Sequence, residues 1–112
     1  MIEPRPASGL LVSALIRRVE AEGGSAMVIA RGDAIAGAML VLFADRGKLL
    51  RLAERVWRFE GGFRLEAVGP KDPGEPGAAA DYIARRRKSD PDLWVIEIDH
   101  GEAERIAGEV LR

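Results

Sequence analysis

The chain has 112 residues, which predicts a single domain over residues 1–112 that can bury one hydrophobic core without metals or disulfides. Its 17 basic and 18 acidic side chains give a formal net charge of -1, so there is no global electrostatic reason to bind nucleic acid or anionic lipid. The sequence shows no cysteine, no secretory signal and no apolar run of membrane-spanning length; this excludes disulfides, thiolate zinc sites and a cysteine nucleophile, and it predicts a soluble cytoplasmic protein.

The first predicted element is a helix from about Leu10 to Glu22. Ser8 precedes it and can cap a backbone N–H of the first turn, and Gly23-Gly24 ends it because glycine readily takes the left-handed conformation. Apolar residues recur along the helix at helical spacing, so we expect them to pack on the protein's own sheet. These residues are Leu11, Val12, Leu15, Ile16 and Val19.

Two short strands are expected next, at Ala26–Arg31 and Ala38–Phe43. Both are apolar at successive positions, which is typical of central strands with two covered faces. The segment between them contains Arg31-Gly32-Asp33, a tripeptide that could serve cell adhesion. Glycine and aspartate also dominate turns for backbone reasons alone, so we interpret residues 31–37 as a hairpin loop.

A third strand is expected at Lys48–Glu54, and Gly61-Gly62 is a hairpin signal that leads into a fourth strand at Phe63–Ala67. The fourth strand alternates apolar and charged residues, as a half-buried edge strand does. Trp57 and Phe59 could stack on nucleobases, but packing across the hairpin is the commoner use of such aromatic residues.

The last third of the chain predicts a helix, a strand and a short helix. After a proline-rich loop, the helix runs from about Pro76 to Lys88, and the strand runs from Leu93 to Asp99. The short helix covers Glu102 to Leu111, and Asp99 followed by Glu102 resembles a capping box. One face of the strand is expected to be buried against the first helix. This face carries Trp94, Ile96 and Ile98.

Together these elements predict an α+β fold. It has about five strands in a largely antiparallel sheet, two main helices and a short C-terminal helix, in two layers with the helices mainly on one face. Links of hairpin length make the first four strands antiparallel neighbours, whereas the fifth strand follows a helix and can run in either direction. The edge strand expected at Phe63–Ala67 also predicts a homo-oligomer, and we expect a homodimer, because unpaired edges are open to pairing.

The densest set of reactive groups lies at the end of the fifth strand. Glu97 and Asp99 are two residues apart and project from one face, so with Asp92 they could hold a divalent cation, and His100 could act as ligand or base. The stretch faintly resembles the nuclease pattern Pro-Asp…Asp/Glu-x-Lys, although Asp99 stands where that pattern has lysine. The alternative that we favour is structural: Glu97 and Asp99 face solvent, Asp99 caps the last helix, and His100 is a surface residue. It predicts no metal and no cofactor.

A second cluster, Arg85, Arg86 and Arg87, lies near the end of the second helix. It could contact an anion or an acidic partner. Cations at this position also offset the negative end of the helix dipole, and consecutive residues fan around a helix without forming one basic face. We therefore expect weak, salt-sensitive contact with polyanions at most and no specific recognition of nucleic acid.

Several short motifs stand out together. They are Ser8-Gly9-Leu10, Arg17-Arg18, Arg31-Gly32-Asp33 with Gly37-Ala38, Tyr82-Ile83-Ala84-Arg85, and the stretch Asp90-Pro91-Asp92-Leu93-Trp94-Val95-Ile96-Glu97. Over roughly residues 3 to 99 the chain resembles an uncharacterised bacterial family, associated with alphaproteobacteria and catalogued as domain of unknown function 1491. The resemblance implies a small, stand-alone cytoplasmic protein, and it supplies no activity, cofactor or catalytic residue.

Two hypotheses for the function follow. The first is a non-catalytic interaction module that self-associates through a sheet edge or binds an unidentified protein partner, away from membranes. The second is a small divalent-metal-dependent hydrolase or nuclease that uses Asp92, Glu97 and Asp99. Convergence of these carboxylates would favour the enzyme, whereas separated carboxylates beside exposed apolar surface would favour the module.

Overall fold

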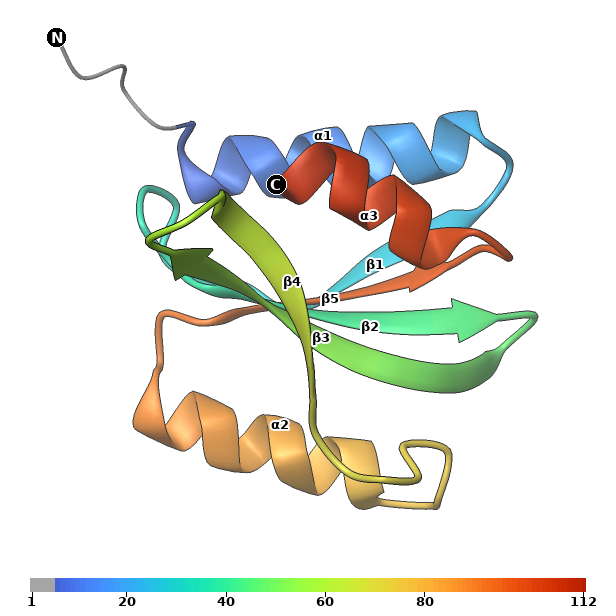
Figure 1. Ribbon diagram of the computed structural model, residues 1–112. Coiled ribbons are helices and arrows are strands. Elements are labelled where there is room, and N and C mark those ends of the chain that lie inside the picture. Colours follow the sequence, from blue (N-terminus) through green and yellow to red (C-terminus); the bar gives the residue numbers. More distant parts are fainter. Residues whose placement is uncertain (1–5) are drawn as a thin grey trace, which may run out of the picture.

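A computed structural model describes residues 6–112 of the chain (Figure 1). Within these residues the chain forms three helices and five strands, close to the predicted positions. In chain order they are α1 (Ser8–Ala21), β1 (Ser25–Ala30), β2 (Met39–Asp45), β3 (Lys48–Arg58), β4 (Gly62–Val68), α2 (Ala78–Ser89), β5 (Trp94–Asp99) and α3 (Ala103–Leu111).

The five strands form one open mixed sheet in the order β1-β5-β2-β3-β4. Three of the four pairings are antiparallel, and only β2 and β5 run parallel. This confirms the predicted α+β fold with a largely antiparallel sheet. It also shows β4 at an edge, as its alternating sequence predicts.

The predicted hairpin at residues 31–37 is wrong, because β5 lies between β1 and β2. Strand β5 carries larger apolar side chains than β1 and buries Trp94, Val95 and Ile96 almost completely. A central place therefore removes more apolar surface from water for β5 than it would for β1. Strand β1 becomes the second edge of the sheet, with every other residue exposed, and its predicted central position is also wrong.

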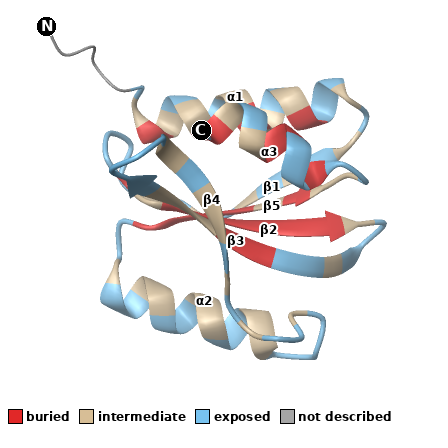
Figure 2. Cartoon of the chain, in the orientation of Figure 1, coloured by how far each residue is buried: buried red, intermediate tan, exposed pale blue. Residues whose placement is uncertain are grey.

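Helices lie on both faces of the sheet. Helices α1 and α3 cover one face and form the main core with the inner sides of β2 and β5, whereas α2 lies over the other face (Figures 1 and 2). Helix α2 therefore adds a third, thinner layer to the two layers that were predicted. The expected burial of one face of β5 against α1 is confirmed, since Trp94, Ile96 and Ile98 are at most 4% exposed and belong to the main core.

The start of α1 is capped by a loop and not by the predicted serine. The N-cap position is Ala7, and Ser8 lies inside the first turn. The backbone N–H of Ser8 donates to the carbonyl of Ile35 at 3.1 Å, and its buried hydroxyl donates to the carbonyl of Gly37 at 2.8 Å. The first-turn donors of a helix need acceptors, and here the loop after β1 supplies them.

The same loop is fastened to the start of β5. Gly32 and Gly37 both lie against the carbonyl of Asp92, and a Cβ atom at either glycine would come within 2.1 or 2.4 Å of that oxygen. The indole Nε1 of Trp94 donates to the carbonyl of Asp33 at 2.7 Å. Motifs that are more than fifty residues apart in the sequence therefore meet at one structural junction, where only glycine leaves room for the contact.

Candidate interaction surfaces

The structure does not bring the predicted metal ligands together. Asp92 lies in the turn before β5 and Asp99 is the last residue of that strand, so the whole length of Trp94–Asp99, about 17 Å of extended chain, lies between them. Among residues 6–112, no three histidine, aspartate or glutamate side chains are placed to hold a metal ion. The geometry therefore gives no support to the hydrolase hypothesis.

Asp99 serves the turn between β2 and β3. Its Oδ1 accepts a hydrogen bond from the backbone N–H of Arg46 at 2.9 Å, and its Oδ2 accepts one from Gly47 at 2.8 Å. Arg46 and Gly47 both take positive φ angles, of 53° and 79°, so the carboxylate stabilises a tight turn with two unusual backbone conformations. The predicted capping of α3 by Asp99 is wrong, because Glu102 holds the N-cap position and has no side-chain cap bond there.

His100 joins the end of α1 to the start of α3. Its Nδ1 accepts a hydrogen bond from the backbone N–H of Glu102 at 2.8 Å. Its Nε2 lies 2.9 Å from the carbonyl oxygen of Glu22, so the neutral ring with its proton on Nε2 satisfies both contacts. The ring is half-buried and occupied at both nitrogens within the described structure, which makes it a link between two helices and not the predicted surface residue.

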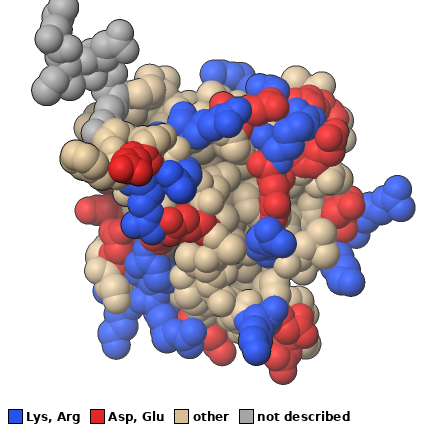
Figure 3. Space-filling model, viewed as in Figure 1, with Lys and Arg blue, Asp and Glu red and all other residues tan. Residues whose placement is uncertain are grey.

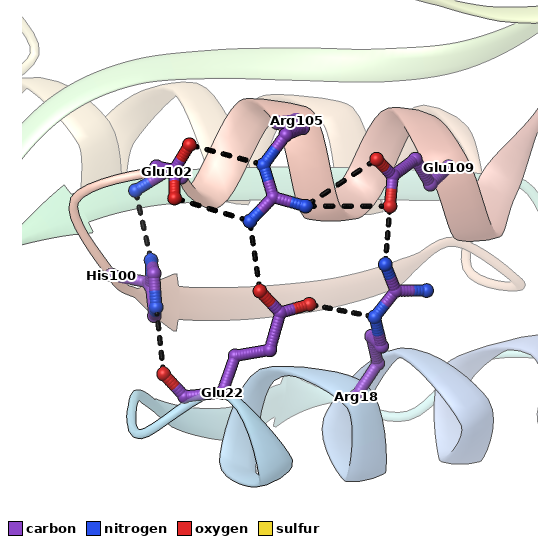
Figure 4. A network of polar contacts seen from close by, with 6 residues as sticks. All are labelled: Arg18, Glu22, His100, Glu102, Arg105 and Glu109. Carbon is purple, nitrogen blue, oxygen red and sulfur yellow. Dashed lines mark hydrogen bonds and ion pairs between the residues drawn. The ribbon is translucent and has the colours of Figure 1, made fainter.

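An ionic network extends this link along α1 and α3 (Figure 4). Arg105 donates to Glu22 at 2.8 Å and to Glu102 at 3.1 Å, and it also pairs with Glu109 at 3.3 Å. Arg18 pairs with Glu22 at 2.7 Å and contacts Glu109 as well. The hydrogen bond from Arg105 lowers the pKa of Glu22 and that of Glu102 below their ordinary range. The charged pairs within each helix are three or four residues apart and can be recognised in the sequence. The ion pairs between the two helices cannot.

The three arginines of α2 do not converge on one point. Arg86 forms an ion pair with Glu54 on β3, and this hydrogen bond raises the pKa of Arg86 above its ordinary value. Arg87 instead donates to the carbonyl oxygens of Arg31 at 2.9 Å and Leu93 at 2.6 Å. Arg85 is exposed and makes no hydrogen bond or ion pair with the residues that the structure describes. Two of the three thus fasten α2 to the sheet, and charges of both signs are intermixed on the face seen in Figure 3.

The two edge strands of the sheet, β1 and β4, differ in how well they are protected against pairing with another chain. Strand β4 carries Arg64 and Glu66, and Glu66 is held by Arg58 of the neighbouring strand. Charged side chains on an edge oppose pairing with another chain.

Strand β1 contains no charged residue, and its side chains Met27 and Ile29 are 57% and 42% exposed. Met27 lies on the face of α2, because its neighbours Ala26 and Val28 pack toward α1 and α3. Ile29 lies at a register shift of β1 and precedes Ala30, which packs on the α2 side.

A groove lies where the start of α1, the end of α3 and the β3–β4 hairpin meet, and its volume is about 660 Å³. Most of its walls are apolar. The larger apolar residues in these walls are Leu11, Ile35, Met39, Trp57, Phe63 and Val110. The rings of Trp57 and Phe63 pack edge to face with centroids 5.1 Å apart, so the predicted packing across the hairpin is confirmed for Trp57. It is wrong for Phe59, which is 98% exposed.

Arg55 and Arg112 complete the lining of this groove. Arg55 lies over the ring of Phe63 at 3.5 Å and also contacts the carbonyl of Leu111 at the end of α3. No local pattern in the sequence predicts the groove, since its parts come from four separate segments. Within residues 6–112, no helix combines the length and the apolar character needed to cross a membrane.

Comparisons with known proteins place the chain in a family. The model of the family described as "Protein of unknown function (DUF1491)" matches residues 7–108. A search of curated proteins finds no match. Among solved structures, the chain is similar to the crystal structure of a DUF1491 family protein from Caulobacter crescentus CB15, with 36% identity and a TM-score of 0.76 over 89% of this chain and 92% of that one.

Two solution structures give the same result. The NMR structure of a DUF1491 family protein from Caulobacter crescentus CB15 has 36% identity and a TM-score of 0.74, with 89% of this chain and 90% of that chain covered. The solution structure of protein Atu0922 from A. tumefaciens has 35% identity and a TM-score of 0.71, with 88% of each chain covered. With a family model that matches nearly the whole length and solved relatives that share its fold, the chain belongs to the DUF1491 family.

Proposed function

We propose that the protein is a non-catalytic interaction module that pairs with a second copy of itself through the exposed edge of β1. The observation that carries this proposal is the exposure of Met27 and Ile29 on an edge strand without any charged residue. An exposed apolar edge is a template for another strand unless charge, proline, a bulge or a covering element protects it. Strand β1 contains neither a charge nor a proline, and its register shift against β5 falls between Val28 and Ala30, near the end of the strand.

Two-fold symmetry defines how the copies would meet. A two-fold axis perpendicular to the sheet makes two identical edge strands antiparallel, and two β1 strands paired in this way would join two five-stranded sheets into one of ten strands. Met27 and Ile29 of each copy would then cover one another at the joined edges. This burial removes apolar surface from water in both copies, and the backbone hydrogen bonds of the edge become satisfied at the same time.

The β1 edge is a better candidate than β4. Pairing of β4 with another strand would take solvent from the charged side chains Arg64 and Glu66, and Glu66 is already held by Arg58. The intermixed surface charge also favours a protein partner over nucleic acid, which needs a concentrated positive field. Since the chain has no cysteine, it fits a reducing compartment, and we infer a cytoplasmic location.

The test compares charged substitutions at two exposed apolar positions. We expect the wild-type protein to sediment as a dimer at high micromolar concentration, and Ile29→Lys to sediment as a monomer because a buried lysine without a partner opposes pairing. Leu50→Lys is the matched control, since Leu50 is 52% exposed but lies on β3, away from the proposed interface. It should leave the dimer intact.

A mixing experiment separates pairing from misfolding. Met27→Lys and Met27→Glu should each be monomeric alone, and an equimolar mixture should recover dimers because Met27 lies near the middle of β1 and opposite charges would then meet. A monomeric wild-type protein at high micromolar concentration would contradict the proposal. Dimers that persist in both the Ile29→Lys and the Met27→Lys variants would contradict it as well.

A further inference from the structure

We propose that Met27 is a site of reversible oxidation, and that oxidation of its thioether to the sulfoxide separates two copies paired through β1. This inference rests on the proposed function, because it describes the regulation of the same edge. The chain has no cysteine, so methionine supplies all of its sulfur. Of the two methionines in residues 6–112, Met39 is fully buried and Met27 is 57% exposed.

The position of Met27 couples its sulfur to the pairing of the edge. Met27 lies near the middle of β1, where a second strand would cover it. It is paired with Glu97 of β5 in the antiparallel register, so the two side chains project from the same face. The thioether is therefore open to solvent in a separate copy and enclosed by the partner copy in the dimer.

Hydrogen peroxide can supply the oxygen atom. A lone pair of the sulfur attacks one peroxide oxygen, the O–O bond breaks and an S–O bond forms. The sulfur loses two electrons, and the departing oxygen takes up a proton and leaves as water. Because the reaction requires direct contact between sulfur and peroxide, exposure decides which methionine reacts.

The sulfoxide should oppose pairing because it changes an apolar group into a polar one. Its oxygen accepts hydrogen bonds from water and would lose them when a second copy covers it. Strand β1 carries no lysine, arginine or histidine that could donate to this oxygen, and the neighbouring carboxylate of Glu97 is itself an acceptor. A buried acceptor without a donor weakens association, so oxidised copies should remain separate.

Pairing should in turn protect the sulfur. Only separated copies expose Met27 to peroxide, and the fraction of separated copies falls as the protein concentration rises. The rate of oxidation at Met27 should therefore decrease with increasing protein concentration. A methionine of similar exposure outside the interface should show no such dependence.

The first experiment treats the full chain with hydrogen peroxide and measures the sulfoxide at each methionine by mass spectrometry of peptides. Leu50→Met supplies the matched reference, since position 50 is 52% exposed on β3 and lies away from the β1 edge. In dilute protein, Met27 and the introduced methionine should react at similar rates, and Met39 should react at least about tenfold more slowly because it is buried. At high micromolar concentration only the reaction at Met27 should slow further.

The second experiment compares the sedimentation of oxidised and untreated protein. Oxidation of Met27 should raise the dissociation constant of the dimer by at least about tenfold. Treatment with the two methionine sulfoxide reductases, one for each epimer of the sulfoxide, should restore it. Met27→Gln carries a permanent polar group and should pair weakly without peroxide, whereas Met27→Leu should pair like the wild type and show no response to peroxide.

Three results would contradict the inference in distinguishable ways. Dimers that survive complete oxidation of Met27 would overturn it and leave the proposed pairing through β1 intact. A loss of dimers after peroxide treatment of Met27→Leu would overturn it as well, because the effect would then arise at another residue. Untreated protein that is monomeric at high micromolar concentration would overturn both proposals, since no pairing would exist for oxidation to control.

Discussion

Helices α3 and α2 lie on opposite faces of the sheet and are held there by different kinds of contact. Helix α3 has nine residues and buries four of them in the main core. Helix α2 has twelve residues, all of them described, and buries none completely. Its attachment depends on the half-buried Tyr82 and Ile83 and on hydrogen bonds from Arg86 and Arg87. One face is thus closed by apolar packing and the other by polar contacts at the end of a helix.

This difference predicts an uneven distribution of stability. Burial of apolar side chains is the largest favourable term in folding, whereas partly exposed ion pairs contribute little. Helix α3 should therefore unfold only with the whole molecule, and α2 should open locally at a lower free energy. Substitutions that remove matched contacts from the two faces measure this difference directly.

The largest effect is expected for Trp94→Ala, which tests the face of the sheet that α1 and α3 cover. Trp94 is 4% exposed, and its indole donates to the carbonyl of Asp33. Loss of the ring leaves a cavity and removes this hydrogen bond, so the free energy of unfolding should fall by about 3–5 kcal/mol. Urea denaturation measures it. Trp94→Phe keeps an aromatic ring at this position, so its free energy of unfolding should fall much less. An equal fall in the two variants would contradict the packing argument.

A matched pair of isoleucines then compares the two helices. Ile106 in α3 is fully buried, and Ile106→Ala should lower the free energy of unfolding by about 3 kcal/mol. Ile83 in α2 is only half-buried, and Ile83→Ala should cost about 1 kcal/mol because solvent fills the space that it leaves. Equal losses at the two positions would show that α2 is packed as firmly as α3.

Sequence patterns predict the elements well because helical and strand periodicity depend on local spacing. They failed for the order of the strands, since β1 and β5 are both apolar and only the comparison of their tertiary burial decides which one lies in the centre. They also failed for the candidate site. Asp99 and His100 carry reactive groups, but their hydrogen bonds join them to the turn after β2 and to the end of α1. These partners are distant in sequence, and no spacing within β5 could reveal them.

A smaller effect is expected from the arginines that fasten α2. Arg86→Ala removes the ion pair with Glu54, and because the pair is partly exposed the loss of stability should be about 1 kcal/mol. Arg85→Ala is the control, since Arg85 is exposed one position away and should change the stability by less than about 0.5 kcal/mol. Amide hydrogen exchange should accelerate in α2 for Arg86→Ala and remain unchanged in α3. Similar exchange profiles for the two variants would mean that the ion pair does not hold the helix.

The smallest effect concerns the ionic network between α1 and α3, and it appears only at low pH. Hydrogen bonds from Arg105 hold the pKa of Glu22 and of Glu102 below the ordinary value of 4.5. A carboxyl group whose pKa is lower in the folded state adds stability above its unfolded pKa and loses that contribution as the pH falls through its folded pKa. The wild-type protein should therefore lose this contribution as the pH decreases below about 4.5. Arg105→Gln removes the shared partner, so its deficit relative to the wild type should be present at neutral pH and should shrink toward zero in acid. Urea denaturation at successive pH values tests this, and a deficit of constant size across the range would show that Arg105 acts through packing and not through these carboxylates.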